Sequence, residues 1–271
     1  MTLLSLALGS IVGLSLGLTG GGGAIFAVPL LVYGLGVEPR DAVGISLAAV
    51  AVTAAVGFWK RWRGGLVEVP TGLLFAVAGM AGAPVGSWLS RQIPQQMLLL
   101  LFAVLMLLVA YRMWQRAGVP PTVLPDEAPD AAGPACRRDA TGRLRLTSPC
   151  AMVLAAVGLG TGVLAGLFGV GGGFVIVPAL VGFSEMPIHR AIGTSLMVIA
   201  LVGVSGVASH LLAGHDVSLA IAAPFIAGGV LGMFAGIAIS GRLSGPRLQR
   251  VFAASIVAVA TFVIIRSTWQ G

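Results

Sequence analysis

The feature that most constrains this chain is a run of glycines inside an apolar stretch, and the run occurs twice. Residues 17–29 read GLTGGGGAIFAVP, and residues 166–178 read GLFGVGGGFVIVP. Seven of these thirteen positions are identical at a constant offset of 149. One fixed offset across several glycines and a proline predicts that the chain is built from two copies of one unit.

The repeat extends beyond the glycine runs. At the same offset, AVGISL at 42–47 aligns with AIGTSL at 191–196. With one extra residue in the second copy, the aligned pairs are Gly82 with Gly232, Gly86 with Gly236 and Phe102 with Phe252. The two copies therefore cover nearly the whole of each half of the chain.

Composition places this repeat in a lipid bilayer. Of the 271 residues, 57% are hydrophobic and only 9% are charged, and the mean hydropathy is +1.01. A soluble domain carries about a quarter charged residues, so this chain cannot cover a water-facing surface and must face lipid. The net charge of +7 does not indicate nucleic-acid binding, because that role needs a basic patch on a water-exposed fold.

The apolar segments follow one another with short breaks, five in each half. They are residues 3–18, 22–36, 42–59, 67–89 and 95–114, then 151–168, 171–184, 191–209, 216–240 and 247–267. The second segment of each set is short, since a full crossing needs about 20 apolar residues. We therefore predict an all-α polytopic membrane protein in which each half begins with a glycine-broken or re-entrant helix pair.

A polar linker separates the halves. Prolines and charges cluster in residues 115–149 and no apolar period survives there, which is typical of a flexible connection. The predicted organisation is an N-terminal transmembrane repeat over 1–114, the linker, and a C-terminal transmembrane repeat over 150–271. Cys136 and Cys150 lie in or beside the linker, and without metal-binding spacing we expect them to be free thiols.

The distribution of basic residues predicts how the halves are oriented. They gather in three regions: Lys60, Arg61 and Arg63; Arg242, Arg247 and Arg250; and the linker residues Arg116, Arg137, Arg138, Arg143 and Arg145. Cytoplasmic loops collect Lys and Arg, so we place all three regions, the linker included, on the cytoplasmic side of a bacterial inner membrane. Each half then crosses an odd number of times and the two halves form an inverted repeat, as in many secondary transporters. A parallel repeat is the alternative, because the charge rule has exceptions.

The glycine breaks have a physical cost that points to a role. Each glycine inside a helix costs about 1 kcal/mol relative to alanine, and a break exposed to lipid leaves backbone groups unpaired. Each break must therefore be buried in protein or line a wet cavity. A helix that restarts after such a break presents free N–H groups and a positive dipole end, and two such ends could form an anion site. The alternative is that the glycines only allow helices to approach closely.

Hydroxyl residues follow each break at equivalent places, in Gly44-Ile45-Ser46 and Gly193-Thr194-Ser195. These hydroxyls either contact an anion directly or bond back to their own helix backbone. The predicted substrate-binding residues are Thr19, Gly20, Gly21, Gly22, Gly23, Gly44, Ser46, Gly169, Gly171, Gly172, Gly173, Gly193, Thr194 and Ser195.

A few ionisable residues lie near segment ends. Arg40, His189 and Arg190 are candidates for a gate or for attracting an anion, with interfacial anchoring as the alternative. His210 is a candidate proton relay, although it falls near a segment end. No HExxH motif, nucleophile elbow or paired acidic residues occur within a segment, so we predict no enzyme, no cofactor and no metal.

The two glycine motifs, each ending in proline and followed by A-x-G-x-S-L, resemble those of the sulfite exporter TauE/SafE family, also called the toluene sulfonate uptake permease family. GLTGGGGAIFAVP with AVGISL and GLFGVGGGFVIVP with AIGTSL carry the match, which spans essentially the full chain. The motifs are specific for the family and not for a substrate. One departure is that Val170 interrupts the second glycine run, which puts the equivalence of the two half-sites in doubt.

Members of that family are associated with moving sulfite, sulfonates such as sulfoacetate, and related organic anions. The resemblance therefore implies a secondary transporter that exports small sulfur-containing anions. Coupling to protons or to the membrane potential is expected on physical grounds, because an anion leaves a negative-inside cell downhill in potential. An anion channel or an uptake permease for other organic anions is the alternative. A structural membrane protein without transport is a third hypothesis.

Overall fold

The computed structural model describes residues 2–90, 92–116, 137–138, 144–145, 148–168, 173–183, 186–212 and 218–269. The helices of the first half are α1 (Thr2–Thr19), α2 (Gly23–Pro29), the π-helix η1 (Leu30–Gly34), α3 (Pro39–Arg63), α4 (Val69–Ser90) and α5 (Gln95–Arg116). Those of the second half are α6 (Ser148–Phe168), α7 (Gly173–Phe183), α8 (Ile188–Leu212), α9 (Leu219–Ser240) and α10 (Gly245–Trp269). The predicted all-α class is thus confirmed for the described residues of both halves.

A short pair of strands in the linker was not expected from the sequence. Within the linker, strands β1 (Arg137–Arg138) and β2 (Leu144–Arg145) pair antiparallel. Cys150, buried in the first turn of α6, is disulfide-bonded, so the expectation of free thiols is wrong for this residue. Cys136, the other cysteine of the chain, lies outside the described residues.

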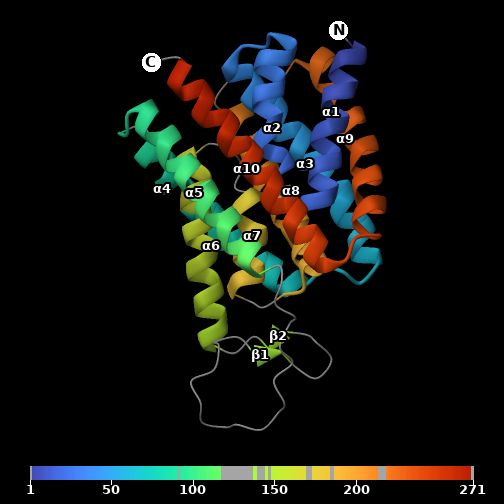
Figure 1. Ribbon diagram of the computed structural model, residues 1–271, viewed down its shortest axis with the longest axis vertical. Coiled ribbons are helices and arrows are strands. Elements are labelled where there is room, and N and C mark those ends of the chain that lie inside the picture. Colours follow the sequence, from blue (N-terminus) through green and yellow to red (C-terminus); the bar gives the residue numbers. More distant parts are fainter. Residues whose placement is uncertain are drawn as a thin grey trace.

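Every predicted apolar segment corresponds to a helix, and the chain forms a bundle with both of its ends at the top of Figure 1. Five of the helices that the structure describes are long and apolar enough to cross a membrane, namely α1, α3, α4, α8 and α9. Large apolar side chains such as Leu3, Val77 and Val204 point outward and are more than half exposed. Such an outer surface suits contact with lipid rather than water.

The first glycine run ends α1 and turns the chain back on itself. A methyl group added at Gly23 would collide with the carbonyl oxygen of Val12, and one at Gly34 would lie 2.7 Å from Leu8. As α2 and η1 advance, they therefore contact earlier and earlier residues of α1, which defines a helical hairpin. The switch to a π-helix directly after Pro29 has a local cause, because proline cannot donate a helical hydrogen bond and its ring crowds the preceding turn.

Two glycine-lined seams join the halves to each other. Gly13 of α1 lies against the carbonyl of Gly229 in α9. Four residues later, a Cβ added at Gly17 would lie 2.7 Å from the carbonyl oxygen of Met233. The helices α1 and α9 are therefore parallel and closely packed. An equivalent parallel seam joins α4 to α6. Its contacts are Gly82 with Leu159 and Gly86 with Val163. The first helix of each half thus packs on the fourth helix of the other half.

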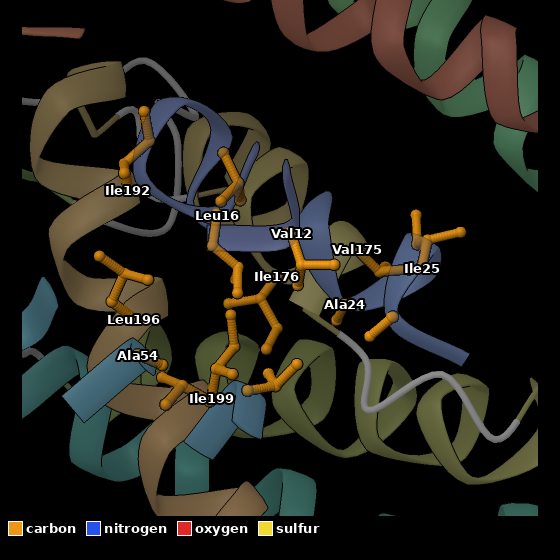
Figure 2. Packing of buried hydrophobic residues seen from close by; sticks show 14 of the residues in the cluster. Val12, Leu16, Ala24, Ile25, Ala54, Val175, Ile176, Ile192, Leu196 and Ile199 are labelled. Atoms are coloured by element: carbon orange, nitrogen blue, oxygen red, sulfur yellow. The ribbon is translucent and has the colours of Figure 1, made fainter. Parts of the chain in front are cut away.

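The third helices of the two halves cross at the centre in opposite directions. Gly203 of α8 lies beside Ala51 of α3, while Gly57, later in α3, contacts Leu196, earlier in α8. Figure 2 shows the core that surrounds this crossing. Its labelled side chains come from α1, α2, α3, α7 and α8 and are Val12, Leu16, Ala24, Ile25, Ala54, Val175, Ile176, Ile192, Leu196 and Ile199. The helices that follow the two glycine runs, α2 and α7, are therefore packed into one core with α1, α3 and α8.

The seams predict a position-specific response to added methyl groups. Gly13→Ala should lower the midpoint of thermal unfolding in detergent, because its Cβ would overlap the Gly229 carbonyl oxygen and overpacking costs about 1–3 kcal/mol. Gly160→Ala is the matched control, since Gly160 lies in α6 with nothing within 4 Å of the added atom. The control should leave the midpoint unchanged or raise it, and equal losses in both variants would contradict the packing of the seam.

Candidate functional site

The first break begins with a glycine in a left-handed conformation. Gly20 has φ of 74°, and its N–H donates to the carbonyl oxygen of Leu16 at 2.7 Å, which closes the last turn of α1. Glycine adopts this conformation without steric strain because it lacks a Cβ. A Cβ here would also lie 2.7 Å from the Ser195 hydroxyl oxygen and 2.8 Å from the Cα of Ile192. The break is therefore held tightly against the first turns of α8.

Thr19 organises the turn that follows. Its hydroxyl donates to the carbonyl oxygen of Ser15 at 2.6 Å and accepts the N–H of Gly22 at 2.9 Å, and the residue is 1% exposed. Ala24 N–H donates to the Gly21 carbonyl at 3.3 Å as α2 begins. Within the described residues, the N–H groups of Gly21 and Gly23 have no acceptor. These two donors are what this break can offer to an anion.

The start of α7, which follows the second glycine run, meets the first break. A Cβ added at Gly173, the first residue of α7, would lie 3.1 Å from the carbonyl oxygen and 3.2 Å from the Cα of Gly21. The same added Cβ would lie 2.8 Å from the Cδ1 of Ile199 in α8. Gly169, Gly171 and Gly172 lie outside the described residues. The described end of the second break is therefore in backbone contact with the first break.

Ser195 connects α8 to the break. Its hydroxyl has two acceptors, the carbonyl oxygen of Gly20 at 2.8 Å and that of Ile192 in its own helix at 2.9 Å. A hydroxyl has one proton, so these two bonds share it. The fully buried Ser195 hydroxyl therefore bonds both to its own helix and to the first break.

The neighbouring residues of the same motif face elsewhere. The Thr194 hydroxyl accepts the backbone N–H of Glu68 at 3.0 Å, and a Cβ at Gly193 would collide with the carbonyl oxygen of Leu66. Both residues therefore contact the loop between α3 and α4. In the first half, Gly44 and Ser46 are buried in the early turns of α3, and the glycine equivalent to Gly20 is Gly169, outside the described residues.

The charged candidates lie at helix ends. Arg190, in the first turn of α8, pairs with Glu68 at 3.7 Å, and the Thr71 hydroxyl donates to the same carboxylate at 3.3 Å. Half-buried His189, also in the first turn of α8, lies close to the backbone of Leu243. Arg40 lies in the first turn of α3 and His210 in the last turn of α8, and the side chains of both lie outside the described part of the structure.

Sequence reasoning missed the role of one residue. Arg61, which the sequence placed in an orienting basic cluster, is only 4% exposed. Its Nη2 donates to the carbonyl oxygen of Gly17 at 3.0 Å and to the Ser240 hydroxyl at 2.7 Å. A signal was available, because Ala54, Gly57 and Arg61 follow the helical spacing of one face and all three are buried. Exposed Lys60 and Arg63 on either side concealed that signal.

The fold and the site define a multi-pass helical membrane protein with a buried polar junction between two packed halves. The family model of the sulfite exporter TauE/SafE matches residues 5–263. A probable membrane transporter protein of Xylella fastidiosa strain Temecula1 is 38% identical over 263 residues, covering 96% of this chain and 93% of that protein. The probable membrane transporter protein YunE of Bacillus subtilis is 29% identical over 77% of each chain. No solved structure matches the chain.

The chain belongs to the TauE/SafE family, which confirms the resemblance seen in its glycine motifs. It is a membrane transporter by family, and its apolar helices agree with a multi-pass arrangement.

The capping role of Thr19 can be tested by removing only its hydroxyl. Thr19→Val keeps the shape of the side chain but leaves the buried Gly22 N–H without its acceptor, which costs about 1–3 kcal/mol. Thr19→Ser is the matched control, because it keeps the hydroxyl and loses one methyl group. Denaturation in a detergent titration should show a larger loss of stability for Thr19→Val. A larger loss for Thr19→Ser would instead indicate that Thr19 acts through its methyl group.

Proposed function

We propose that this protein is a secondary transporter that exports small sulfur-containing anions, such as sulfite, sulfoacetate or other sulfonates, across the inner membrane. The observation that carries the proposal is the contact of Gly173 with Gly21, which brings the start of α7 against the first glycine break inside the protein. Glycine breaks are costly in a membrane, and two that meet in a buried place are explained by a ligand that uses their backbone groups. No enzymatic step is part of the proposal.

The chemistry of the junction suits an oxyanion. The N–H groups of Gly21 and Gly23 can donate to sulfonate or sulfite oxygens, and the positive dipole end of the helix that begins at Gly23 favours negative charge. The Ser195 hydroxyl, which is shared between two carbonyl oxygens, can turn to donate to an anion instead. Such a site holds an anion by hydrogen bonds from backbone N–H groups and a hydroxyl.

We further propose that the halves form an inverted repeat. The third helices α3 and α8 occupy equivalent places in the two halves and cross in opposite directions, which supports a rotation axis in the membrane plane. The exchanged seams support a two-fold relation between the halves, because α1 with α9 and α4 with α6 are equivalent pairs. Inverted repeats of this kind allow a central site to open to either side by rocking of one bundle against the other.

Export follows from the membrane potential. An anion leaves a negative-inside cell downhill, and each charge contributes about 2.3 kcal/mol per 100 mV. Coupling to protons would involve His210, which is near one end of α8. The alternative function is an anion channel or an uptake permease for other organic anions. Counterflow and saturation at low substrate concentration favour the transporter, whereas single-channel currents favour the channel.

The orientation of the linker has evidence on both sides. Three basic regions favour a cytoplasmic linker. The disulfide at Cys150 favours an oxidising compartment, because disulfides are rare in the cytosol. We propose the cytoplasmic orientation, since it rests on basic residues in three separate parts of the chain.

Transport measurements test the site. Purified protein in liposomes should move labelled sulfite or sulfoacetate. Ser195→Leu or Ser46→Leu should reduce the transport rate at least tenfold, which corresponds to about 1.4 kcal/mol in the activation barrier. The reason is that Ser195 is buried beside the first break and Ser46 is buried at the equivalent position of the first half. Ser218→Leu is the control, since Ser218 is exposed and makes no capping bond with its side chain. Wild-type rates in both buried-site variants would exclude these serines from the path.

Thiol labelling tests the orientation. Cys136 and Cys150 are the only two cysteines of the chain, so a membrane-impermeant maleimide reports on the linker region alone. After reduction with a membrane-permeant thiol, intact cells should show no labelling until the membrane is permeabilised. Labelling of intact cells would place the linker on the outer side and reverse the proposed direction of each half.

A further inference from the structure

Arg61 is a charged group buried near one end of the bundle. It lies two residues before the end of α3, and its side chain is 4% exposed. Its two bonds from Nη2 reach one helix of each half, α1 through Gly17 and α9 through Ser240. Its Nε–H is fully buried and has no partner within the described residues. A guanidinium has five N–H donors, so two acceptors do not satisfy it.

The charge of Arg61 lacks a counter-ion. Among the residues that the structure describes, no carboxylate lies within ion-pair distance of its guanidinium, and nearby Glu68 pairs with Arg190 instead. His189 is close enough for its charge to interact with that of Arg61, so protonation of His189 would add to the positive charge there. A buried cation without a counter-ion is costly in a membrane protein and is commonly part of a ligand or ion path.

The position of this charge connects it to the first glycine break. Gly17 is three residues before Gly20, a rise of about 4.5 Å along α1. Arg61 thus bonds the last turn of α1 through Gly17, and Ser195 bonds the first residue of the break, Gly20. An anion that moves from the basic end of the bundle toward Gly21 would pass close to Arg61.

We propose that Arg61 is an anion-binding residue of the transport path, whose guanidinium and free Nε–H receive an oxygen of the transported sulfite or sulfonate beside the first break. This inference rests on the proposed function and adds a fixed charge to a site otherwise built from backbone groups and hydroxyls. It also makes the two ends of the path unequal, because the offset of 149 aligns Arg61 with His210 in the second half.

A structural role for Arg61 predicts different behaviour. The carbonyl ends of α1 and α9 carry partial negative charge, and an arginine that only joins them would stabilise the fold without affecting anions. In that case Arg61→Gln and Ser240→Ala would lower the unfolding temperature together and leave anion affinity unchanged. The two roles are therefore separated by the dissociation constant of an anion, measured on folded protein.

The experiment uses the full chain in detergent and measures the dissociation constants of sulfite and sulfoacetate by calorimetry on monodisperse samples. Arg61→Gln should raise both constants at least tenfold, about the effect of losing a charge-assisted hydrogen bond. Arg61→Lys keeps the charge but not the Nε–H geometry, and should raise them by a smaller factor. Arg63→Gln is the matched control, because Arg63 is exposed at the end of the same helix and stacks on Trp59.

Each outcome decides between the hypotheses. A folded Arg61→Gln variant with wild-type constants would overturn the role of Arg61 while leaving the proposed function intact. If Arg61→Gln does not fold, Arg61→Lys decides instead: raised constants support the proposal, and wild-type constants with a lowered unfolding temperature overturn it. If the wild-type protein neither binds nor transports either anion, the proposed function fails and the inference fails with it.

Discussion

The structure depends on one constraint, which is that backbone N–H and C=O groups inside a membrane must find partners within the protein. The first glycine break meets it for the N–H of Gly22, which donates to the Thr19 hydroxyl, and for the carbonyl of Gly20, which accepts the Ser195 hydroxyl from 175 residues further along the chain. The N–H groups of Gly21 and Gly23 have no acceptor within the described residues and are the donors proposed to bind the anion. A break satisfied this way cannot face lipid. The glycine break therefore has to be enclosed by protein, and the apolar core of α1, α2, α3, α7 and α8 encloses it.

The same constraint explains why the halves are interleaved. The hairpin of α1, α2 and η1 has a polar turn at its tip and is covered by helices of both halves, namely α3, α7 and α9. The exchange of first and fourth helices places α9 against α1 and α6 against α4, while α3 and α8 fill the centre. The proposed binding junction is then formed by both halves, which is consistent with a site that two bundles open and close.

Much of this arrangement is readable from the sequence, because it is local. The end of α1 and the start of α2 follow from Thr19 and the glycines, and the irregular turn at Leu30 follows from Pro29. Contacts between distant segments were not readable in the same way. The pairing of Ser195 with Gly20, and the turning of Thr194 toward Glu68, depend on which helix lies beside α8. Arg61 was hidden for a different reason, since its exposed neighbours made the whole cluster resemble an ordinary basic helix end.

The exchanged seams have a consequence for biosynthesis. The ribosome delivers α1 and α4 to the membrane well before α6 and α9 have been translated. Until then, the glycine faces of the first half have only lipid or unrelated segments beside them. The first half therefore cannot complete its own packing during insertion, and the native contacts of the earliest helix wait for one of the last helices to be synthesised.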